Sequence, residues 1–244
     1  MKTILLHYHL FKNAGTSLDA SLKENFSEKN GEWVTKEFPG QPALNRAQLK
    51  QWIIDNPQAI CFSTHTAIFP VPKIDTVKIF PIIFMRHPID RIASAYAFER
   101  KQGGDGFGSV LARSTNLSGY IETRLSLAND RQCRNFHMQR FASMFGAKLG
   151  DEFVRAKKAI AELPFVGCVE RYSESLERLE RLLGSEGVCI ELNPVERNVS
   201  RNIKKSLDDR LNDIRKEIGD EVYSKLELAN SEDKKLYDCL LGVE

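Results

Sequence analysis

Short apolar runs that alternate with helix-like patterns are the feature of this sequence that most restricts its fold. Runs with the length of buried strands occupy residues 3–8, 59–63, 78–85 and 164–169, and a weaker run occupies residues 188–192. Apolar residues at helical spacing follow the first, third and fourth runs. Strands that alternate with helices predict a parallel sheet with helices on both faces. We therefore expect an α/β chain with a P-loop-like three-layer fold.

The whole chain, residues 1–244, is predicted to form one domain, with a helical segment from about residue 206 to residue 244 packed on it. The formal net charge is only +2, which argues against a nucleic-acid-binding protein. Five scattered cysteines without a Cys-x-x-Cys pair favour a reducing compartment over a disulfide framework or a zinc site. No apolar run approaches membrane-spanning length, so the sequence predicts a cytoplasmic protein without integral membrane contact.

A glycine-containing turn, His9-Leu-Phe-Lys-Asn-Ala-Gly-Thr-Ser17, joins the first predicted strand to the first predicted helix. Backbone N–H groups at such a turn, together with the positive end of the helix dipole, bind phosphate. Lys12 can add an ammonium group, and Gly15 permits close approach of phosphate oxygens, while Thr16 offers a hydroxyl donor. The lysine precedes the glycine, unlike the Gly-Lys pair of the Walker A motif, so the match to an ATP-dependent kinase is poor. An ordinary capped turn between a strand and a helix is the alternative.

A second candidate motif, residues 84–96, follows the third apolar run. Arg86 lies at the end of this predicted strand, where a guanidinium group can bind a phosphate through two hydrogen bonds. Pro88 then opens a helix, and Ser94 lies nearly two turns into it. An anion that contacts both residues must therefore lie beside this helix. The alternative is that Arg86 pairs with an acidic neighbour and that Ser94 faces solvent.

Together the two motifs resemble the phosphate-binding elements of the sulfotransferases that use 3′-phosphoadenosine 5′-phosphosulfate (PAPS). The first motif is similar to their 5′-phosphosulfate loop, and the second to their 3′-phosphate element. The closer match is to the carbohydrate branch, of the heparan sulfate 2-O- and 6-O-sulfotransferase type. Other segments that resemble this branch follow in order along the chain: Thr64-His65-Thr66, residues 135–140, residues 165–179 and Asn198-Val-Ser200. Phe11 and His87 stand where the family usually has proline and aspartate.

The resemblance implies an enzyme that uses PAPS as its donor and needs no metal. The residues that it implies for cofactor binding are Lys12, Asn13, Ala14, Gly15, Thr16, Ser17, Arg86, Ser94, Asn198 and Ser200. The residues that it implies for contact with the acceptor are Asn135, Gln139 and Arg140. The acceptor is expected to be a glycan or another carbohydrate with a free hydroxyl. Residues 27–58 and 100–130 match no acceptor-binding segment of the family, so the sequence does not indicate which carbohydrate is the acceptor.

Two residues are predicted to carry the chemistry. The Lys12 ammonium would stabilise the charge that grows on the oxygen between sulfur and the 5′-phosphate. His65, after the second apolar run, is the candidate base for the acceptor hydroxyl, because a neutral imidazole titrates near working pH. Glu170, after the fourth run, is the alternative base or a structural partner of Arg171.

Three other interpretations stay open. His7 and His9 share one face of the first predicted strand and could bind a metal together with His65, although histidines that support the core or a loop are the commoner case. The chain could instead be a P-loop-like kinase that uses ATP. It could also be a nucleotide-binding or glycan-binding module on the same scaffold that has lost its base.

Overall fold

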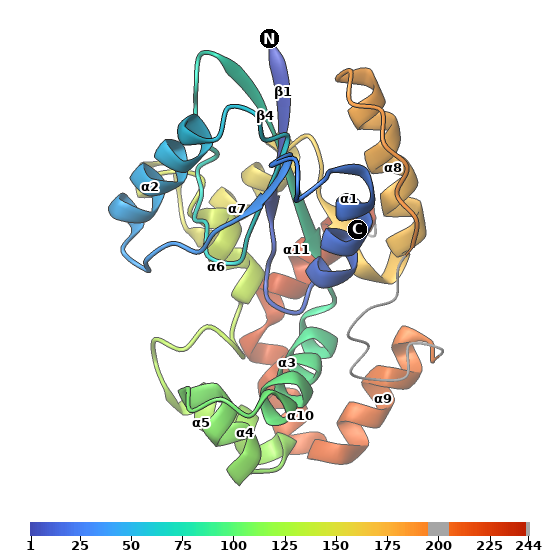
Figure 1. Ribbon diagram of the computed structural model, residues 1–244. Helices are drawn as coiled ribbons and strands as arrows, with labels where there is room; N and C mark the ends of the chain where they lie inside the picture. The colour runs from blue at the N-terminus through green and yellow to red at the C-terminus, as the bar shows by residue number, and fades with distance from the viewer. Residues whose placement is uncertain (195–204, 243–244) are drawn as a thin grey trace. The chain divides into compact units, whose positions relative to one another are not determined.

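The structure, a computed structural model, describes residues 1–194 and 205–242 (Figure 1). These residues form two compact units. The first unit contains residues 1–85 and 140–194, and the second contains residues 86–139 and 205–242. That the whole chain acts as one domain stays a prediction.

The first unit is built on a five-stranded sheet in the order β2-β3-β1-β4-β5, in which all paired strands are parallel. Its strands are β1 (Lys2–Tyr8), β2 (Trp33–Thr35), β3 (Cys61–Thr64), β4 (Val77–Met85) and β5 (Gly167–Cys168). Tyr8, the last residue of β1, is in register with Thr64 of β3 and Ile83 of β4. The carboxyl end of β1 is therefore flanked by a strand on each side.

Helices cover both faces of this sheet, with α1 and α8 on one side of β1 and β4 and α2 and α7 on the other (Figure 1). The helical segments of the first unit are α1 (Gly15–Asn25), α2 (Pro42–Asp55), η1 (Ala147–Leu149), α7 (Glu152–Glu162), η2 (Val169–Arg171) and α8 (Tyr172–Ser185). On one face, Leu5 belongs to a buried cluster with Leu18 of α1 and Leu179 of α8. On the other face, the ring of Trp52 in α2 lies 5.0 Å from that of Phe62 in β3. The predicted α/β fold, with a parallel sheet between two helical layers, is confirmed.

Two details of the predicted strands are wrong. Residues 188–192 do not form a strand. Their apolar side chains instead pack against the buried cluster on the α1 side of the sheet, and this packing produces the apolar run. β2 was not predicted, because it is three residues long and pairs with β3 alone. A strand of this length is too short to show a pattern in the sequence.

The second unit is helical. Its helices are α3 (Pro88–Gln102), α4 (Phe107–Ser114), α5 (Leu117–Ser126), α9 (Leu207–Ile218), α10 (Asp220–Ala229) and α11 (Ser231–Leu241), while α6 (Phe136–Ala142) runs across the division between the units. A buried cluster joins Ile92 of α3, Ile121 of α5 and Ile214 of α9. The C-terminal helices therefore pack on the helices that follow β4 in the chain. Across the described residues, none of the helices has the length and apolar character needed to cross a lipid bilayer.

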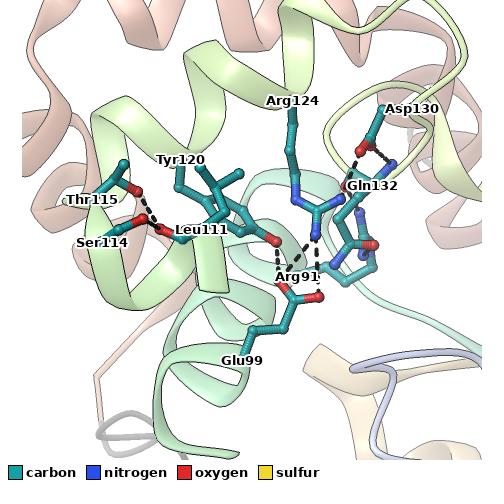
Figure 2. Close-up of polar contacts among 9 residues, drawn as sticks. All are labelled: Arg91, Glu99, Leu111, Ser114, Thr115, Tyr120, Arg124, Asp130 and Gln132. Atoms are coloured by element: carbon teal, nitrogen blue, oxygen red, sulfur yellow. Dashed lines mark hydrogen bonds and ion pairs between the residues drawn. The ribbon is translucent and has the colours of Figure 1, made fainter. Parts of the chain in front are cut away.

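A buried polar network lies within the second unit (Figure 2). Arg124 of α5 pairs with Glu99 of α3 at 3.1 Å and with Asp130, in the loop after α5, at 2.7 Å. The Tyr120 hydroxyl donates to the Glu99 carboxylate at 2.5 Å. We refer to these four residues as the Arg124 network. It ties α3, α5 and the loop that follows α5 to one another.

Candidate functional site

The predicted phosphate loop connects β1 to α1 and has an uncommon backbone conformation. Lys12 and Ala14 both lie in the left-handed region, with φ values of 62° and 60°. Residues other than glycine rarely adopt this conformation, because Cβ then crowds the backbone. Ala14 is also the N-cap residue of α1, and no side chain caps the helix at this position. The N-cap side chain therefore accepts no hydrogen bond from the first helical turn, in which the Ser17 N–H donates to the carbonyl oxygen of Ala14 at 3.0 Å.

This backbone is suited to binding an anion. Left-handed residues that alternate with other conformations direct successive N–H groups into one concavity, and such concavities bind phosphate. The positive end of the α1 dipole adds to the attraction. At Gly15, a Cβ atom would lie 2.0 Å from Cδ2 of His9, so a larger residue could enter the loop only by displacing that ring. The left-handed conformation of Lys12 and Ala14 is thus compatible with the predicted anion site.

The side chains of the loop differ in their surroundings. The Asn13 amide is buried and donates to the carbonyl oxygen of Phe11 at 2.9 Å, so this side chain shapes the loop. Ser17 is buried, Thr16 is exposed and Lys12 is half-buried. The six residues predicted to bind the cofactor here, 12–17, therefore lie in the turn after β1 and in the first turn of α1.

A buried group of polar side chains lies next to this loop. His7 and His9 lie two residues apart along the chain at the end of β1, and the carboxylate of Asp19 in α1 contacts both of their rings. His7 Nδ1 is 2.6 Å from Asp19 Oδ1, and His9 Nδ1 is 2.8 Å from Asp19 Oδ2. The Ser63 hydroxyl of β3 donates to Asp19 Oδ1 at 2.8 Å. We refer to these four residues as the His–Asp cluster.

The protonation states within the His–Asp cluster follow from these contacts. Burial would raise the pKa of Asp19, but the imidazoles of His7 and His9 and their hydrogen bonds hold this pKa well below its usual range. Asp19 is therefore an ionised carboxylate, which only accepts hydrogen bonds. It follows that His7 and His9 each carry a proton on Nδ1. Burial lowers the pKa of His9, which favours the neutral ring with an unprotonated Nε2.

His65, the predicted base, follows β3 and is accessible to solvent. Its ring centroid lies 3.8 Å from that of His9, and its backbone N–H donates to Glu37 at 3.2 Å. Partial burial lowers the pKa of His65 and the neighbouring His9 lowers it further, whereas Glu37 and Asp19 oppose this shift. A pKa below the usual histidine range keeps His65 neutral at pH 7, which is the state that a general base requires.

The sequence left open a metal site at His7 and His9. One potential ligand atom from each of His7, His9 and Asp19 lies within 4.8 Å of the other two. Both Nδ1 atoms, however, donate protons to the Asp19 carboxylate, and Ser63 donates to the same group. The arrangement is a complete hydrogen-bond network, and we assign no metal to it.

The predicted 3′-phosphate element lies in the second unit. Arg86 pairs with the buried Asp90 at 2.7 Å, as the alternative interpretation of this motif proposed. Arg210 of α9 contacts the same carboxylate at 3.2 Å. Burial would raise the pKa of Asp90, but the two guanidinium groups lower it. Ser94, one turn beyond Asp90 in α3, is buried, so the alternative that it faces solvent is wrong. Two guanidinium groups around one carboxylate leave a net positive charge that suits a phosphate.

The residues predicted to contact the acceptor have other surroundings. The Asn135 side-chain oxygen accepts a hydrogen bond from the Asp233 N–H at 3.1 Å, so this amide supports the start of α11. Gln139 is exposed. Arg140 is half-buried, and burial lowers the pKa of its guanidinium group. The contacts of Asn135 are those of a structural residue, and the acceptor role of all three residues stays a prediction.

Two predicted cofactor contacts, Asn198 and Ser200, lie outside the described residues. Glu170, the alternative base, lies in η2. Its carboxylate accepts a hydrogen bond from the Cys168 thiol at a sulfur–oxygen distance of 3.4 Å.

Asp19 and Arg210 were not predicted from the sequence. A signal for Asp19 existed, because two histidines on one strand face require a polar partner and Asp19 is the first acidic residue in the following helix. Arg210 has no local signal, because it lies 120 residues from Asp90 in the chain.

Comparison with known proteins identifies a relative of the chain. A protein of Archaeoglobus fulgidus is 38% identical over 250 residues, which cover 99% of this chain and 97% of that protein. The chain belongs to the same family as this archaeal protein. The archaeal member of the family is described as an uncharacterized protein. No protein-family model matches the chain.

Proposed function

We propose that the protein is a sulfotransferase that moves a sulfuryl group from PAPS to a hydroxyl of a carbohydrate or glycan. The observation that carries this proposal is the loop between β1 and α1. Left-handed Lys12 and Ala14 there precede a helix N-terminus without a side-chain cap, at the carboxyl end of a central strand. This backbone suits an anion, and the residues of the loop resemble the 5′-phosphosulfate loop of sulfotransferases. A cytoplasmic location is part of the same proposal.

In this proposal the chain supplies two phosphate-binding elements. The loop with Lys12 binds the 5′-phosphosulfate, and Arg86 with Ser94 binds the 3′-phosphate. Arg210 supports the second element, because it shares the Asp90 carboxylate with Arg86 and leaves a positive charge in excess. A donor nucleotide with a phosphate on its 3′-oxygen is therefore expected.

The transfer step forms a bond from the acceptor oxygen to sulfur and breaks the bond from sulfur to the bridging oxygen of PAPS. Negative charge grows on that bridging oxygen, which leaves as part of 3′,5′-ADP. The Lys12 ammonium stabilises this charge more than it stabilises the ground state, and this difference lowers the barrier. The acceptor proton passes to His65. Lys12 and the loop supply the positive charge for this step, so we expect transfer to continue in EDTA.

A transfer assay with radiolabelled PAPS tests the proposal directly. The acceptors are a panel of glycans, simple carbohydrates and other hydroxyl-bearing molecules, and release of labelled sulfate to water provides a readout without any acceptor. We expect Lys12→Ala to weaken nucleotide binding and turnover together. We expect His65→Ala to lower kcat by about 10²- to 10⁴-fold with unchanged affinity for 3′,5′-ADP. Lys73→Ala, at an exposed surface lysine of the first unit, is the matched control for the lysine variant.

The same assay separates the other interpretations. Magnesium-dependent transfer of phosphate from ATP, with no transfer from PAPS, would indicate a kinase and overturn the proposal. Binding of 3′,5′-ADP without transfer to any acceptor or to water would indicate a binding module. Normal turnover of His65→Ala would remove His65 from the mechanism and leave Glu170 as the next residue to test.

A further inference from the structure

The His–Asp cluster is buried and lies next to the phosphate loop, yet the proposed reaction uses none of its four residues. The side chains of His7 and His9 are 1% and 8% exposed, and that of Asp19 is 19% exposed. Polar groups buried to this extent destabilise a protein unless their hydrogen bonds are made. Here they are made, because Asp19 accepts hydrogen bonds from both imidazoles and from Ser63. A carboxylate bonded in this way fixes the orientation and the tautomer of an imidazole.

His9 connects this cluster to the predicted active site. Asp19 holds its Nδ1 atom. The opposite edge of the ring lies against Gly15, where a Cβ atom would be 2.0 Å from Cδ2 and 2.3 Å from Nε2. The ring of His65 lies beside the same imidazole, with a centroid distance of 3.8 Å. The His9 ring is therefore held by a carboxylate, by the loop backbone and by the candidate base.

We propose that Asp19 is a positioning residue for the candidate base, because it holds His9 at Nδ1 and thereby fixes the ring against which His65 lies. The catalytic consequence of this inference rests on the proposed sulfotransferase function. The arrangement of the rings does not rest on it, and can be measured without donor or acceptor.

Asp19 also acts on His65 through its charge. The charged and titratable groups that face His9 and His65 come from three places: His7 on β1, Asp19 on α1 and Glu37 after β2. Both carboxylates raise the pKa of His65, against the lowering by burial and by His9. Removal of the Asp19 charge therefore lowers the pKa of His65 further and leaves Glu37 as the opposing carboxylate. Two more titratable groups interact with Asp19, and burial raises the pKa of both: Cys61 and Tyr172.

Asp19→Asn tests the inference, because it keeps the size of the side chain and changes its hydrogen bonding. A carboxylate can accept a proton from each imidazole, whereas an amide offers one accepting oxygen and one NH2 donor. The imidazole that faces the NH2 group must accept at Nδ1 and carry its proton on Nε2, or lose the hydrogen bond. His7 or His9 therefore changes its tautomer or its partner. Glu24→Gln makes the same chemical change at an exposed position of the same helix and is the matched control.

Nitrogen NMR of the imidazole rings measures both tautomer and pKa. The chain has five histidines, so each signal can be assigned by substitution. In the wild type we expect His7 and His9 to be protonated at Nδ1. In Asp19→Asn we expect one of them to show an Nε2 proton and the pKa of His65 to fall, while Glu24→Gln keeps the wild-type pattern. Wild-type rings protonated at Nε2, or an unchanged His65 pKa in a folded Asp19→Asn variant, overturns the inference.

Asp19→Glu provides a second variant in case Asp19→Asn does not fold. This variant keeps a carboxylate on a side chain that is one methylene longer. We expect His7 and His9 to stay protonated at Nδ1 and the pKa of His65 to stay close to its wild-type value. A folded Asp19→Glu variant whose His9 is protonated at Nε2, with wild-type activity, overturns the inference as well. A melting temperature for each variant shows which of them are folded.

Turnover tests the catalytic consequence. We expect Asp19→Asn to lower kcat by about 10- to 100-fold, less than the loss of the base itself, with unchanged affinity for 3′,5′-ADP. The acidic limb of its pH profile should move to lower pH, because the His65 pKa falls. If wild-type protein transfers no sulfuryl group while the NMR pattern is as expected, the proposed function fails and the ring arrangement stands. If wild type transfers the group and Asp19→Asn keeps its kcat and pH profile, the positioning role fails.

Discussion

Each unit of the protein buries a group of hydrogen-bonded polar side chains, and the two groups differ in what lies beside them. In the Arg124 network of the second unit, a guanidinium group lies between two carboxylates and ties helices to a loop (Figure 2). In the His–Asp cluster of the first unit, one carboxylate holds two imidazoles, and the ring of His9 lies against Gly15 and against the accessible His65.

This difference separates a stabilising role from a positioning role. Burial and hydrogen-bonded ion pairing are common to both groups, so neither property indicates function. The partners of the Arg124 network are the helices and loop that it joins, which is what a structural network requires. The His–Asp cluster instead supports a ring that lies against the predicted phosphate loop and a candidate base. The neighbours of a buried polar group therefore decide how it is interpreted.

Loss of Arg124 should produce the largest effect. Arg124→Met leaves the carboxylates of Glu99 and Asp130 without their cation, and breaking a buried ion pair in this way destabilises a protein by about 3–5 kcal/mol. The Arg124 side chain is 8% exposed, which places it in this class. Urea unfolding measures the change in the free energy of unfolding. Arg113→Met, at an exposed arginine of α4, is the control. A loss below about 1 kcal/mol would mean that the network behaves like surface ion pairs.

Acid should destabilise the protein more through His87, a buried histidine of the second unit, than through His9. Burial lowers the pKa of His87 to about 4, and Lys234 adds to this shift, whereas for His9 the Asp19 carboxylate opposes it. An unfolded histidine binds its proton near pH 6.5, so lowering the pH from 6.5 to 4 favours the unfolded state by about 3 kcal/mol. Below pH 4 both states are protonated and the difference stays constant. We expect His87→Asn to remove this part of the pH dependence of unfolding. An identical pH dependence in the variant would contradict the assignment.

Gly15→Ala should have a smaller effect, confined to the phosphate loop. The new methyl group meets the His9 ring, and overpacking of this kind costs about 1–3 kcal/mol. If the strain falls on the anion-binding conformation, the Kd for 3′,5′-ADP rises by about 5- to 150-fold. Isothermal titration calorimetry measures it. Gly40→Ala is the control, because a Cβ atom at Gly40 meets nothing within 4 Å. Wild-type affinity in Gly15→Ala would show that the ring moves aside without consequence for the loop.

The central strands could be predicted from the sequence for a physical reason. β1, β3 and β4 are covered by helices on both faces, so each is a continuous apolar run. Such a run can be recognised without knowing which strands pair with it. β2 and the two-residue β5 are defined mainly by their pairing with a neighbouring strand, and pairing leaves little trace in so short a segment. Residues 188–192 show the opposite error, since coil that packs on a core can be as apolar as a strand.

The candidate site could be predicted where its residues are contiguous or follow neighbouring strands, as His9 and His65 do. Residues 12–17 form one short segment from the turn after β1 into α1, so their proximity follows from their order along the chain. The contact of Asp19 with His7 and His9 depends on how α1 packs against β1, and the contact of Arg210 with Asp90 depends on the packing of α9. The left-handed conformation of Lys12 and Ala14 had no signal, because neither residue is a glycine.

Sulfuryl transfer from PAPS requires one nucleotide to use both the loop at Lys12 and the element at Arg86. The most direct measurement compares the melting temperature of the protein with 3′,5′-ADP and with 5′-AMP at equal concentration. At a hundredfold excess over Kd, ligand binding stabilises a protein by about 2.7 kcal/mol, which is about 5–10 °C for a chain of this size. We expect this shift with 3′,5′-ADP, a much smaller shift with 5′-AMP, and no difference between the two nucleotides in Arg86→Gln. Equal shifts from the two nucleotides in the wild-type protein would contradict the assignment of Arg86 and Ser94 to a 3′-phosphate, and with it the choice of PAPS as donor.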